Sequence, residues 1–255
     1  MQPLVSATIF AQNIVHYFRI PSTSTAAMTA AAEGEPEGSV FVAEEQTGGR
    51  GRGGHKWDSA PNVGIYFSAI LRPHMPPADA LLLSLAAGLA VGEAVREVTG
   101  ITTDLRWPND VLLGDKKVCG ILAEMNAEVT RVRHVVLGIG LNVNQTEFPG
   151  ELASIATSLR IATGRAWSRV ELFTALLKSL DREYRALQQP EAAADIVQRF
   201  QAASSVARGC PVQVDEDGGY TGTTEGLDER GFLLVRTERG VRRVLSGTVR
   251  KLASK

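Results

Sequence analysis

The feature that most constrains the fold of this chain is a series of apolar strand patterns separated only by tight turns. The patterns cover residues 111–113, 118–125 and 134–143, and they follow the longest helical pattern, which covers residues 77–99. Sequential strands joined in this way favour antiparallel or mixed pairing within one sheet. We therefore expect an α+β fold, in which a mixed, mostly antiparallel sheet packs against helices.

The character of the sequence changes after residue 205. Before that point, further strands are predicted over residues 14–20, 39–43 and 63–71, and helices over residues 26–32, 169–187 and 191–203. After it, helical patterns stop and short strands are predicted over residues 212–214, 220–226, 232–236 and 241–249. We therefore predict two domains, residues 1–205 and residues 206–255, and the second has the rhythm of a small β-barrel.

Length and charge narrow the class of protein. The chain has 255 residues, enough for a large and a small domain, and its formal net charge of -1 gives no bulk positive field for nucleic acid. The most apolar stretch, residues 80–95, is interrupted by glycine, serine and glutamate, which argues against a membrane span. Cys119 and Cys210 form no disulfide or zinc framework, and no targeting segment is visible. We expect a cytoplasmic protein that binds neither membranes nor nucleic acid.

The first segment with chemical character is glycine-rich and contains Arg50 and Arg52 within residues 48–54. Glycines let backbone N–H groups approach an anion closely, and each guanidinium can bind a phosphate or carboxylate through two hydrogen bonds. The segment lacks the spacing of a Walker loop and the following helix of a Rossmann fingerprint. It predicts an anion-binding loop, and the alternative is a flexible surface loop with two solvated charges.

Two further segments indicate a pocket beside the predicted sheet. Residues 106–110, Arg-Trp-Pro-Asn-Asp, form a turn, and a hairpin would bring Asp110 close to Lys117 at the start of the next strand. Residues 138–144, Gly-Ile-Gly-Leu-Asn-Val-Asn, form an apolar strand with internal glycines, which often mark the close approach of a ligand. The alternatives are a structural turn, a solvated lysine and a β-bulge.

Together these segments resemble the motifs of the biotin protein ligase family, the biotin–[carboxylase] ligases. They occur in the family's order and the match runs over nearly the whole chain. Residues 44–52, Glu-Glu-Gln-Thr-Gly-Gly-Arg-Gly-Arg, together with Trp57 resemble the family's biotin and adenylate loop, and residues 106–110 resemble its Lys-Trp-Pro-Asn-Asp motif. Lys117 with residues 120–124 resembles its Lys-x-x-Gly-Ile-Leu-x-Glu strand. Residues 138–144 resemble its Gly-Ile-Gly-Ile-Asn-Val-Asn strand.

Three positions depart from the family pattern. Ser22-Thr23-Ser24 stands where the family has Ser-Thr-Asn, so the hydroxyls are kept and an amide is lost. His55 stands where the family's loop carries a third arginine, and histidine is only partly charged near neutral pH. Arg106 replaces a lysine, which keeps the charge but changes its geometry.

The resemblance implies a class II synthetase-like catalytic domain followed by an SH3-like C-terminal barrel. It also implies an ATP-dependent reaction in two steps. Biotin first becomes biotinyl-5′-AMP, and a lysine of a biotin carboxyl carrier protein or domain then accepts the biotin. The expected ligands are biotin, ATP and Mg²⁺, whose coordination would come mostly from phosphate oxygens and water. The expected assembly state is a monomer or homodimer.

The residues implied for the site fall into three overlapping groups. Lys117, Arg50 and Arg52 are expected to act in catalysis by neutralising the two reacting anions. Biotin is expected to contact Ser22, Thr23, Ser24, Gln46, Arg50, Gly51, Arg52, Lys117, Gly120 and Gly138. The nucleotide is expected to contact Arg52, Trp57, Arg106, Asn109, Asp110 and Asn142, and no metal-ligating residue is implied.

Three other functions stay open. Lipoate or octanoate transfer would use the same fold class with a different acid pocket, and residues 48–54 and 106–110 disfavour it. A biotin-responsive transcriptional regulator would carry an N-terminal helix-turn-helix domain, for which the roughly twenty residues before Ser22 are too few. A module that only sequesters a nucleotide would release no pyrophosphate from ATP in the presence of biotin.

Overall fold

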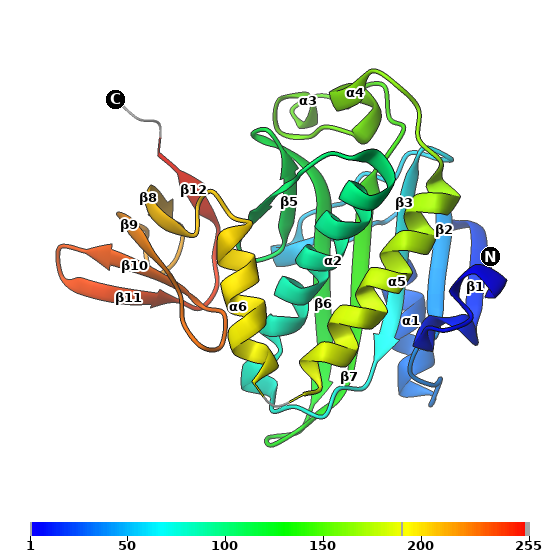
Figure 1. Cartoon of the computed structure of the whole chain (residues 1–255), viewed down its shortest axis with the longest axis horizontal. Helices are drawn as coiled ribbons and strands as arrows, with labels where there is room; N and C mark the ends of the chain where they lie inside the picture. Colours follow the sequence, from blue (N-terminus) through cyan, green and yellow to red (C-terminus); the bar gives the residue numbers. More distant parts are fainter. Residues whose placement is uncertain (1, 190, 253–255) are drawn as a thin grey trace.

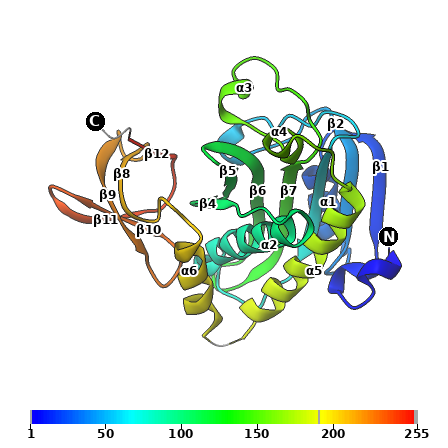
Figure 2. The same cartoon turned by 45° about the horizontal axis from the view of Figure 1, so that its top comes forward.

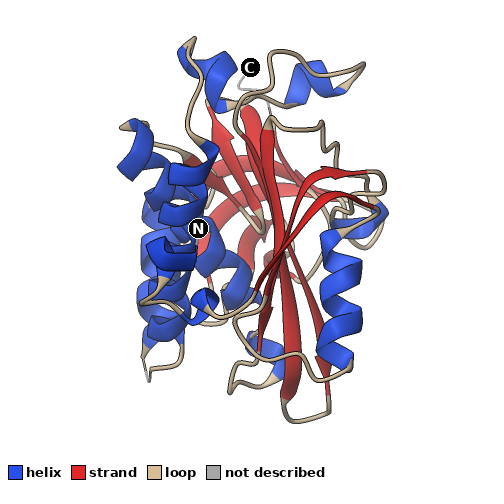
Figure 3. Ribbon diagram, turned by 90° about the vertical axis from the view of Figure 1, so that its right-hand side faces the viewer, coloured by secondary structure: helices blue, strands red, loops and turns tan. Residues whose placement is uncertain are grey.

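The computed structural model describes residues 2–189 and 191–252, and it contains two β-sheets, the larger of which is covered by helices (Figure 1). Helices lie on both faces of the larger sheet (Figure 3). Helix α1 (Thr23–Ala32) packs on one face against β2, β3 and β7, whereas α2 (Leu81–Thr99) and α5 (Arg169–Leu187) cover the other. This is the α+β arrangement that the sequence predicts.

Seven strands form the larger sheet in the order β1-β2-β3-β7-β6-β5-β4. The β1–β2 pair is parallel and the other neighbours are antiparallel, so the sheet is mixed and mostly antiparallel, as predicted. Strand β4 was not predicted, because three residues are too few to show an alternating pattern. The strands are β1 (Ile14–Ile20), β2 (Val40–Gln46), β3 (Gly64–Leu71), β4 (Asp104–Arg106), β5 (Asp110–Leu113), β6 (Lys116–Ala127) and β7 (Val132–Asn142).

Strand β7 shows how the larger sheet separates two environments. Successive side chains of a strand point to opposite faces. Leu137 and Ile139 therefore enter the main core beneath α2 and α5, whereas Val136 packs with Ala27 of α1. The glycines of β7 share the face of Val136, which leaves space beside α1.

The helices begin and end where sequence signals place them. Ser22 caps α1, since its hydroxyl accepts the Thr25 N–H, and α2 ends at Gly100, whose φ of 74° is left-handed. The two short helices α3 (Leu152–Ile155) and α4 (Leu159–Thr163) were not predicted, because one turn gives no helical periodicity. The remaining helices are α6 (Ala192–Ala202) and the 3₁₀ turns η1 (Gln2–Val5), η2 (Ile9–Ala11), η3 (Arg52–Gly54) and η4 (Pro77–Asp79).

Length and composition alone would allow the segment Pro77–Thr99 to cross a membrane, contrary to the prediction from its polar and glycine interruptions. In the fold, the segment is mostly buried, and its helix α2 packs against α5, α6 and the larger sheet. Packing in the core therefore accounts for its apolar character, and no other helix in the described part of the chain passes the same test.

Five strands form the smaller sheet in the order β11-β10-β9-β8-β12. The strand predicted over residues 241–249 is wrong, because the chain turns at Gly247 (φ 86°) and forms two strands that do not pair with each other. No pairing joins β11 to β12 in the described residues, so the SH3-like barrel stays a prediction. The strands are β8 (Arg208–Val214), β9 (Tyr220–Leu227), β10 (Leu233–Thr237), β11 (Gly240–Val244) and β12 (Val249–Lys251).

The two sheets meet beside α6 (Figure 2), and buried contacts join them. The indole Nε1 of Trp107 donates a hydrogen bond of 2.8 Å to the Gly231 carbonyl. A Cβ at Gly231 would lie 2.6 Å from Cδ1 of Leu85 in α2, so only glycine fits there without a shift. The smaller sheet is therefore packed against the core of the larger domain.

Candidate active site

A pocket lies on the α1 face of the larger sheet, between the first turn of α1, the glycine-rich loop and strands β6 and β7. It contains nine of the ten residues predicted to bind biotin, and three of those predicted to bind the nucleotide. The lining residues are Thr23, Ser24, Gln46, Arg50, Gly51, Arg52, Trp57, Phe67, Asn109, Lys117, Gly120, Ile121, Leu122, Gly138, Ile139 and Gly140.

A chain of hydrogen bonds forms the polar end of the pocket. Gln46 Oε1 accepts the Thr23 backbone N–H at 2.8 Å and its hydroxyl at 3.1 Å. The Ser68 hydroxyl lies 2.9 Å from that of Thr23 and 3.0 Å from that of Ser24. The Gln46 amide donates to the Ser59 hydroxyl at 3.1 Å. These paired donors and acceptors suit a ligand with a compact polar head in an otherwise apolar pocket.

Two glycines create the surface on which Trp57 lies. Gly120 of β6 pairs directly with Gly140 of β7. A Cβ at Gly140 would overlap the indole of Trp57, and one at Gly120 would lie 2.8 Å from its Cζ3 atom. Glycine is therefore required at both positions by the close approach of an aromatic ring, as the strand glycines suggested.

Lys117 lies where the hairpin prediction placed it. Its Nζ is 2.6 Å from Asp110 Oδ1 and 5.4 Å from the centroid of the Trp57 ring. Asn109 lies beside this pair and donates from Nδ2 to the Ile121 carbonyl at 2.8 Å, which fixes the turn against β6. The ammonium group is thus positioned by a carboxylate and an aromatic face, and it remains about one-third exposed (32%) toward the pocket.

The two arginines of the glycine-rich loop have different anchors. Arg50 pairs with Glu124 of β6, and Arg52 Nη1 donates to the Gly247 carbonyl of the smaller sheet at 2.9 Å. Burial lowers the pKa of the Arg52 guanidinium, and the charges of Asp110 and Glu216 oppose that shift. The loop is therefore held at two points rather than free on the surface.

Four predicted residues do not line the pocket. Ser22 caps α1, and Asp110 reaches the site only through Lys117. Asn142 is buried, donating to the Thr157 carbonyl at 3.1 Å and accepting from Gln145. Arg106 of β4 pairs with Asp110 in the sheet and is not one of the lining residues. The biotin contact expected of Ser22 and the nucleotide contacts expected of Asp110, Asn142 and Arg106 therefore lack support from the pocket itself.

Other residues of the site were missed by the sequence analysis. Ser68 could have been found, because it interrupts the otherwise apolar strand β3 and is fully buried. Glu124 ends the Lys-x-x-Gly-Ile-Leu-x-Glu motif, and the structure pairs it with Arg50. Gly140 was noted within its strand, but no signal showed that Trp57 packs on it.

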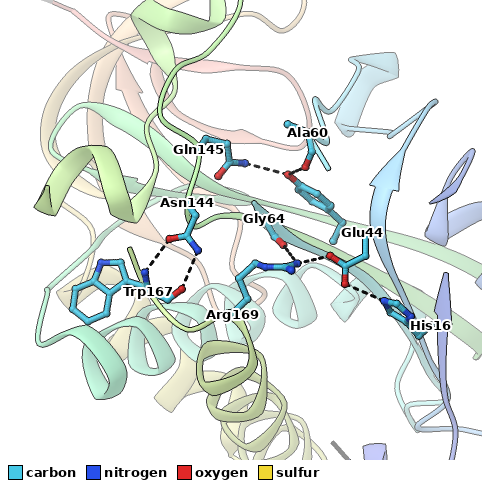
Figure 4. A network of polar contacts seen from close by, with 9 residues as sticks. His16, Glu44, Ala60, Gly64, Asn144, Gln145, Trp167 and Arg169 are labelled. Atoms are coloured by element: carbon cyan, nitrogen blue, oxygen red, sulfur yellow. Dashed lines mark hydrogen bonds and ion pairs between the residues drawn. The ribbon is translucent and has the colours of Figure 1, made fainter. Parts of the chain in front are cut away.

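A second polar network supports the neighbouring end of β2 (Figure 4). Glu44 accepts from Arg169 at 2.6 Å and lies 3.0 Å from His16 Nε2. Burial raises the pKa of Glu44, but the hydrogen bonds from Arg169 and His16 outweigh burial and leave that pKa below its usual range. The Tyr66 hydroxyl donates to the Ala60 carbonyl at 3.0 Å. This network fixes the strand that carries Gln46 into the pocket.

Comparison with known proteins matches two parts of the chain to family models. Residues 17–142 match the biotin/lipoate A/B protein ligase family, and residues 209–252 match the biotin protein ligase C terminal domain. The bifunctional ligase/repressor BirA of Bacillus subtilis is 35% identical over 244 residues, which are 94% of this chain and 74% of that protein. The biotin--[acetyl-CoA-carboxylase] ligase of Mycobacterium tuberculosis is 38% identical over 83% of this chain and 79% of its own length.

A solved structure shares the whole fold. The biotin protein ligase from Aquifex aeolicus in complex with biotin and ATP has a TM-score of 0.82 and 33% identity, covering 94% of this chain and 100% of that one. Fold and pocket thus define a protein ligase of the biotin and lipoate class. The chain covers most of the length of relatives that are more than 30% identical to it, and its C-terminal part matches the model of the biotin protein ligase C terminal domain. The chain therefore belongs to the biotin protein ligase family.

Proposed function

We propose that the pocket beside α1 performs both steps of a biotin ligase reaction. In the first step the biotin carboxylate attacks the α-phosphate of ATP, forming a mixed anhydride and releasing pyrophosphate. In the second step a carrier lysine attacks the acyl carbon, forming an amide and releasing AMP. The observation that carries this proposal is the convergence of Lys117, Arg50 and Arg52 with the polar end formed by Thr23 and Gln46 in one pocket.

The cationic residues address the main barrier of the first step, the approach of two anions. Lys117 is already oriented by Asp110, so its charge needs little reorganisation to stabilise developing charge between carboxylate and phosphate. Arg50 and Arg52 lie on the loop opposite and would neutralise the remaining phosphate charge. Thr23 and Gln46 would hold the polar ring of biotin, so that its carboxylate points toward Lys117.

Magnesium fits this chain only as a companion of ATP. The described residues contain no group of three or more histidine, cysteine, aspartate or glutamate side chains that could hold a metal ion. The carboxylates nearest the pocket, Asp110 and Glu124, are engaged by Lys117 and Arg50. Phosphate oxygens and water would therefore supply the ligands of Mg²⁺.

The C-terminal domain, residues 206–255, is proposed to be SH3-like and to help complete the site. Arg52 donates to the carbonyl of Gly247, which lies in the turn between β11 and β12. A carrier lysine approaching the pocket would meet this turn together with the glycine-rich loop. The carrier itself is proposed to be a biotin carboxyl carrier protein or domain, and the site of action the cytoplasm.

The test of this function is direct. The protein is incubated with ATP, Mg²⁺ and either biotin or lipoate, and the products are analysed by mass spectrometry for the acyl adenylate. Biotinyl-5′-AMP and pyrophosphate are expected with biotin, and no lipoyl adenylate is expected. A lipoyl adenylate as the main product, or nucleotide binding without pyrophosphate release, would contradict the proposal.

A further inference from the structure

A second cavity lies at the opposite end of α1, on the same face of the larger sheet. Its volume is about 840 Å³, which is within the usual range for small-molecule sites. Its walls come from the C-terminal end of α1, the segment between β3 and α2, and the β6–β7 hairpin. The lining residues are Ala31, Ala32, Gly34, Arg72, Pro73, His74, Met75, Pro76, Asn126, Glu128, Thr130, Arg131, Val132, Arg133 and His134.

The charges on these walls are unbalanced. Three arginines line the cavity against a single carboxylate, that of Glu128. Glu128 is shared by two of them, because its carboxylate lies 2.9 Å from Arg131 Nε and 2.9 Å from Arg133 Nη2. The third, Arg72, donates to the carbonyls of Ala31 and Glu35 at 3.1 and 2.8 Å, which carry no full charge. Among the side chains that line the cavity, positive charges therefore exceed negative ones by two, and behind this wall the Glu37 carboxylate accepts the backbone N–H of Arg72.

A buried histidine at the same cavity lacks a hydrogen-bond partner. His134 of β7 is only 4% exposed, and it faces the α1 side of the sheet together with Val136. Among the described residues, none forms a hydrogen bond with its Nε2 atom. A buried polar atom without a partner is costly, and such groups mark places where a ligand or ion completes the structure.

We propose that this cavity binds a small phosphate monoester, with its phosphate between Arg131, Arg133 and the imidazole of His134. A phosphate monoester carries close to two negative charges near neutral pH, which matches the excess of positive charge. The apolar wall formed by Pro73, Met75 and Val132 suits the organic body of such a compound. This site is separate from the pocket of the proposed ligase reaction and does not depend on it.

The binding is coupled to protonation of His134. Burial lowers the pKa of His134, and the charges of Arg72 and Arg133 lower it further. A phosphate within a few ångströms would favour the imidazolium and raise that pKa. The other charged or titratable groups that line the cavity are His74, Glu128 and Arg131. Behind Arg72 lie the carboxylates of Glu35, which accepts from the Ser39 hydroxyl, and of Glu37, which accepts from the Tyr184 hydroxyl.

Histidine NMR of the intact protein tests the proposal at the site itself. The chain has four histidines, so the His134 signals can be followed while the pH is varied with and without inorganic phosphate. Phosphate should raise the His134 midpoint by about one pH unit, and chloride at equal ionic strength should not. Phenyl phosphate should bind several-fold more tightly than inorganic phosphate, because its ring can cover the apolar wall. A His134 midpoint that phosphate leaves unchanged overturns the proposal.

Two arginine variants provide a matched pair. Arg131 and Arg250 are both 70% exposed and both paired with a carboxylate, but Arg250 lies in the smaller sheet. Arg131→Gln should weaken phosphate binding at least several-fold without loss of fold, whereas Arg250→Gln should leave it unchanged. Equal effects of the two variants would show a nonspecific response to net charge and would reject the site.

Discussion

Lys117 is held between a carboxylate and an aromatic ring, 2.6 Å from Asp110 and 5.4 Å from the centre of Trp57. Such an arrangement orients the ammonium group before any substrate arrives. The neighbouring Lys116 is exposed and donates to the Ala153 carbonyl instead. Two adjacent lysines thus have the same chemistry but different surroundings, and only one reaches the pocket.

Replacing Lys117 should therefore affect the chemical step. Lys117→Ala is expected to slow biotinyl adenylate formation by about 2–4 kcal/mol of activation free energy, since a charge-assisted contact is lost at the reacting groups. Transfer from pre-made adenylate should be slowed less. Single-turnover measurement of pyrophosphate release checks this, with Lys116→Ala as the control. An unchanged rate in Lys117→Ala would show that the assignment of this lysine is wrong.

His134 makes the stability of the fold depend on pH. Its pKa in the folded protein is lowered by burial and by Arg72 and Arg133, so the unfolded chain binds a proton at higher pH than the folded one. The free energy of unfolding should accordingly fall as the pH drops through and below the ordinary imidazole value of about 6.5. Above that value the stabilising contribution of the neutral, buried His134 to the free energy of unfolding is fully present.

The comparison of wild type with His134→Gln isolates this effect. Urea unfolding at a series of pH values should show that the wild type loses more stability than the variant as the pH falls from neutral. The absolute stability of the variant does not matter, because only the difference in slope is used. Parallel pH profiles would mean that His134 titrates alike in the folded and unfolded chains.

At the scale of elements, the glycine-rich loop is an ordered hairpin with two anchors. The Trp57 N–H donates to the Gly49 carbonyl at 2.9 Å, and the Gly51 N–H donates to the His55 carbonyl at 2.7 Å. Gly53 and Gly54 have φ of 66° and 81°, conformations that favour glycine. The loop is therefore shaped to close over the pocket, with Arg50 tied to β6 and Arg52 to the smaller sheet.

Loss of one anchor should loosen the retention of the adenylate. Arg52→Gly is expected still to form biotinyl-5′-AMP, because Lys117 and Arg50 remain, but to release it faster. The released anhydride would acylate lysines of a bystander protein such as serum albumin, while labelling of the carrier falls. Blotting for biotin measures both.

His55→Gly is the matched control for this loop. It adds the same flexibility to an exposed position but removes no anchor, so bystander labelling should stay near the wild-type level. If Arg52→Gly still forms the adenylate and the bystander stays unlabelled, the loop does not retain the intermediate.

The sequence predicted most elements, because each carries a local signal. The β-branched and aromatic residues of β1, the spacing of apolar residues in α5 and the glycine after α2 are each read within one segment. The contact of Arg52 with Gly247 spans 195 positions and has no local trace. Asn142 was expected to contact the nucleotide because it lies in a motif, whereas in the fold its side chain donates to the buried backbone carbonyl of Thr157. Motifs therefore located the pocket, whereas the partners of each side chain needed the fold.

At the scale of the whole molecule, the smaller sheet is part of the core rather than an appendage. Removing residues 206–255 would expose Leu85 and the indole of Trp107, both of which pack against Gly231. We therefore expect a truncated chain to be destabilised, and a role of this domain in carrier docking has to be tested with point substitutions at its surface.

Trp107→Phe tests the junction between the sheets. The phenyl ring keeps much of the buried apolar surface but leaves the Gly231 carbonyl without its donor, so the free energy of unfolding should fall by about 1–3 kcal/mol. Chemical denaturation measures this, and Trp167→Phe is the control. The Trp167 indole donates to Thr163 within one local segment and is only half-buried, so a smaller loss is expected there. Equal losses of stability in the two variants would show that the hydrogen bond between Trp107 and Gly231 does not contribute specially to holding the two sheets together.

The alternation of side chains along β7 limits how this protein can change over evolutionary time. One face of the strand supplies Gly138 and Gly140 to the first pocket and His134 to the second cavity, while the other face fills the core with Leu137 and Ile139. A single inserted residue within the strand would exchange the two faces and abolish both sites together. The turn between β6 and β7 can change in length without exchanging the two faces, but it carries Arg131 and Glu128 of the second cavity. Related chains that keep the second cavity should therefore keep both the turn and the length of the strand.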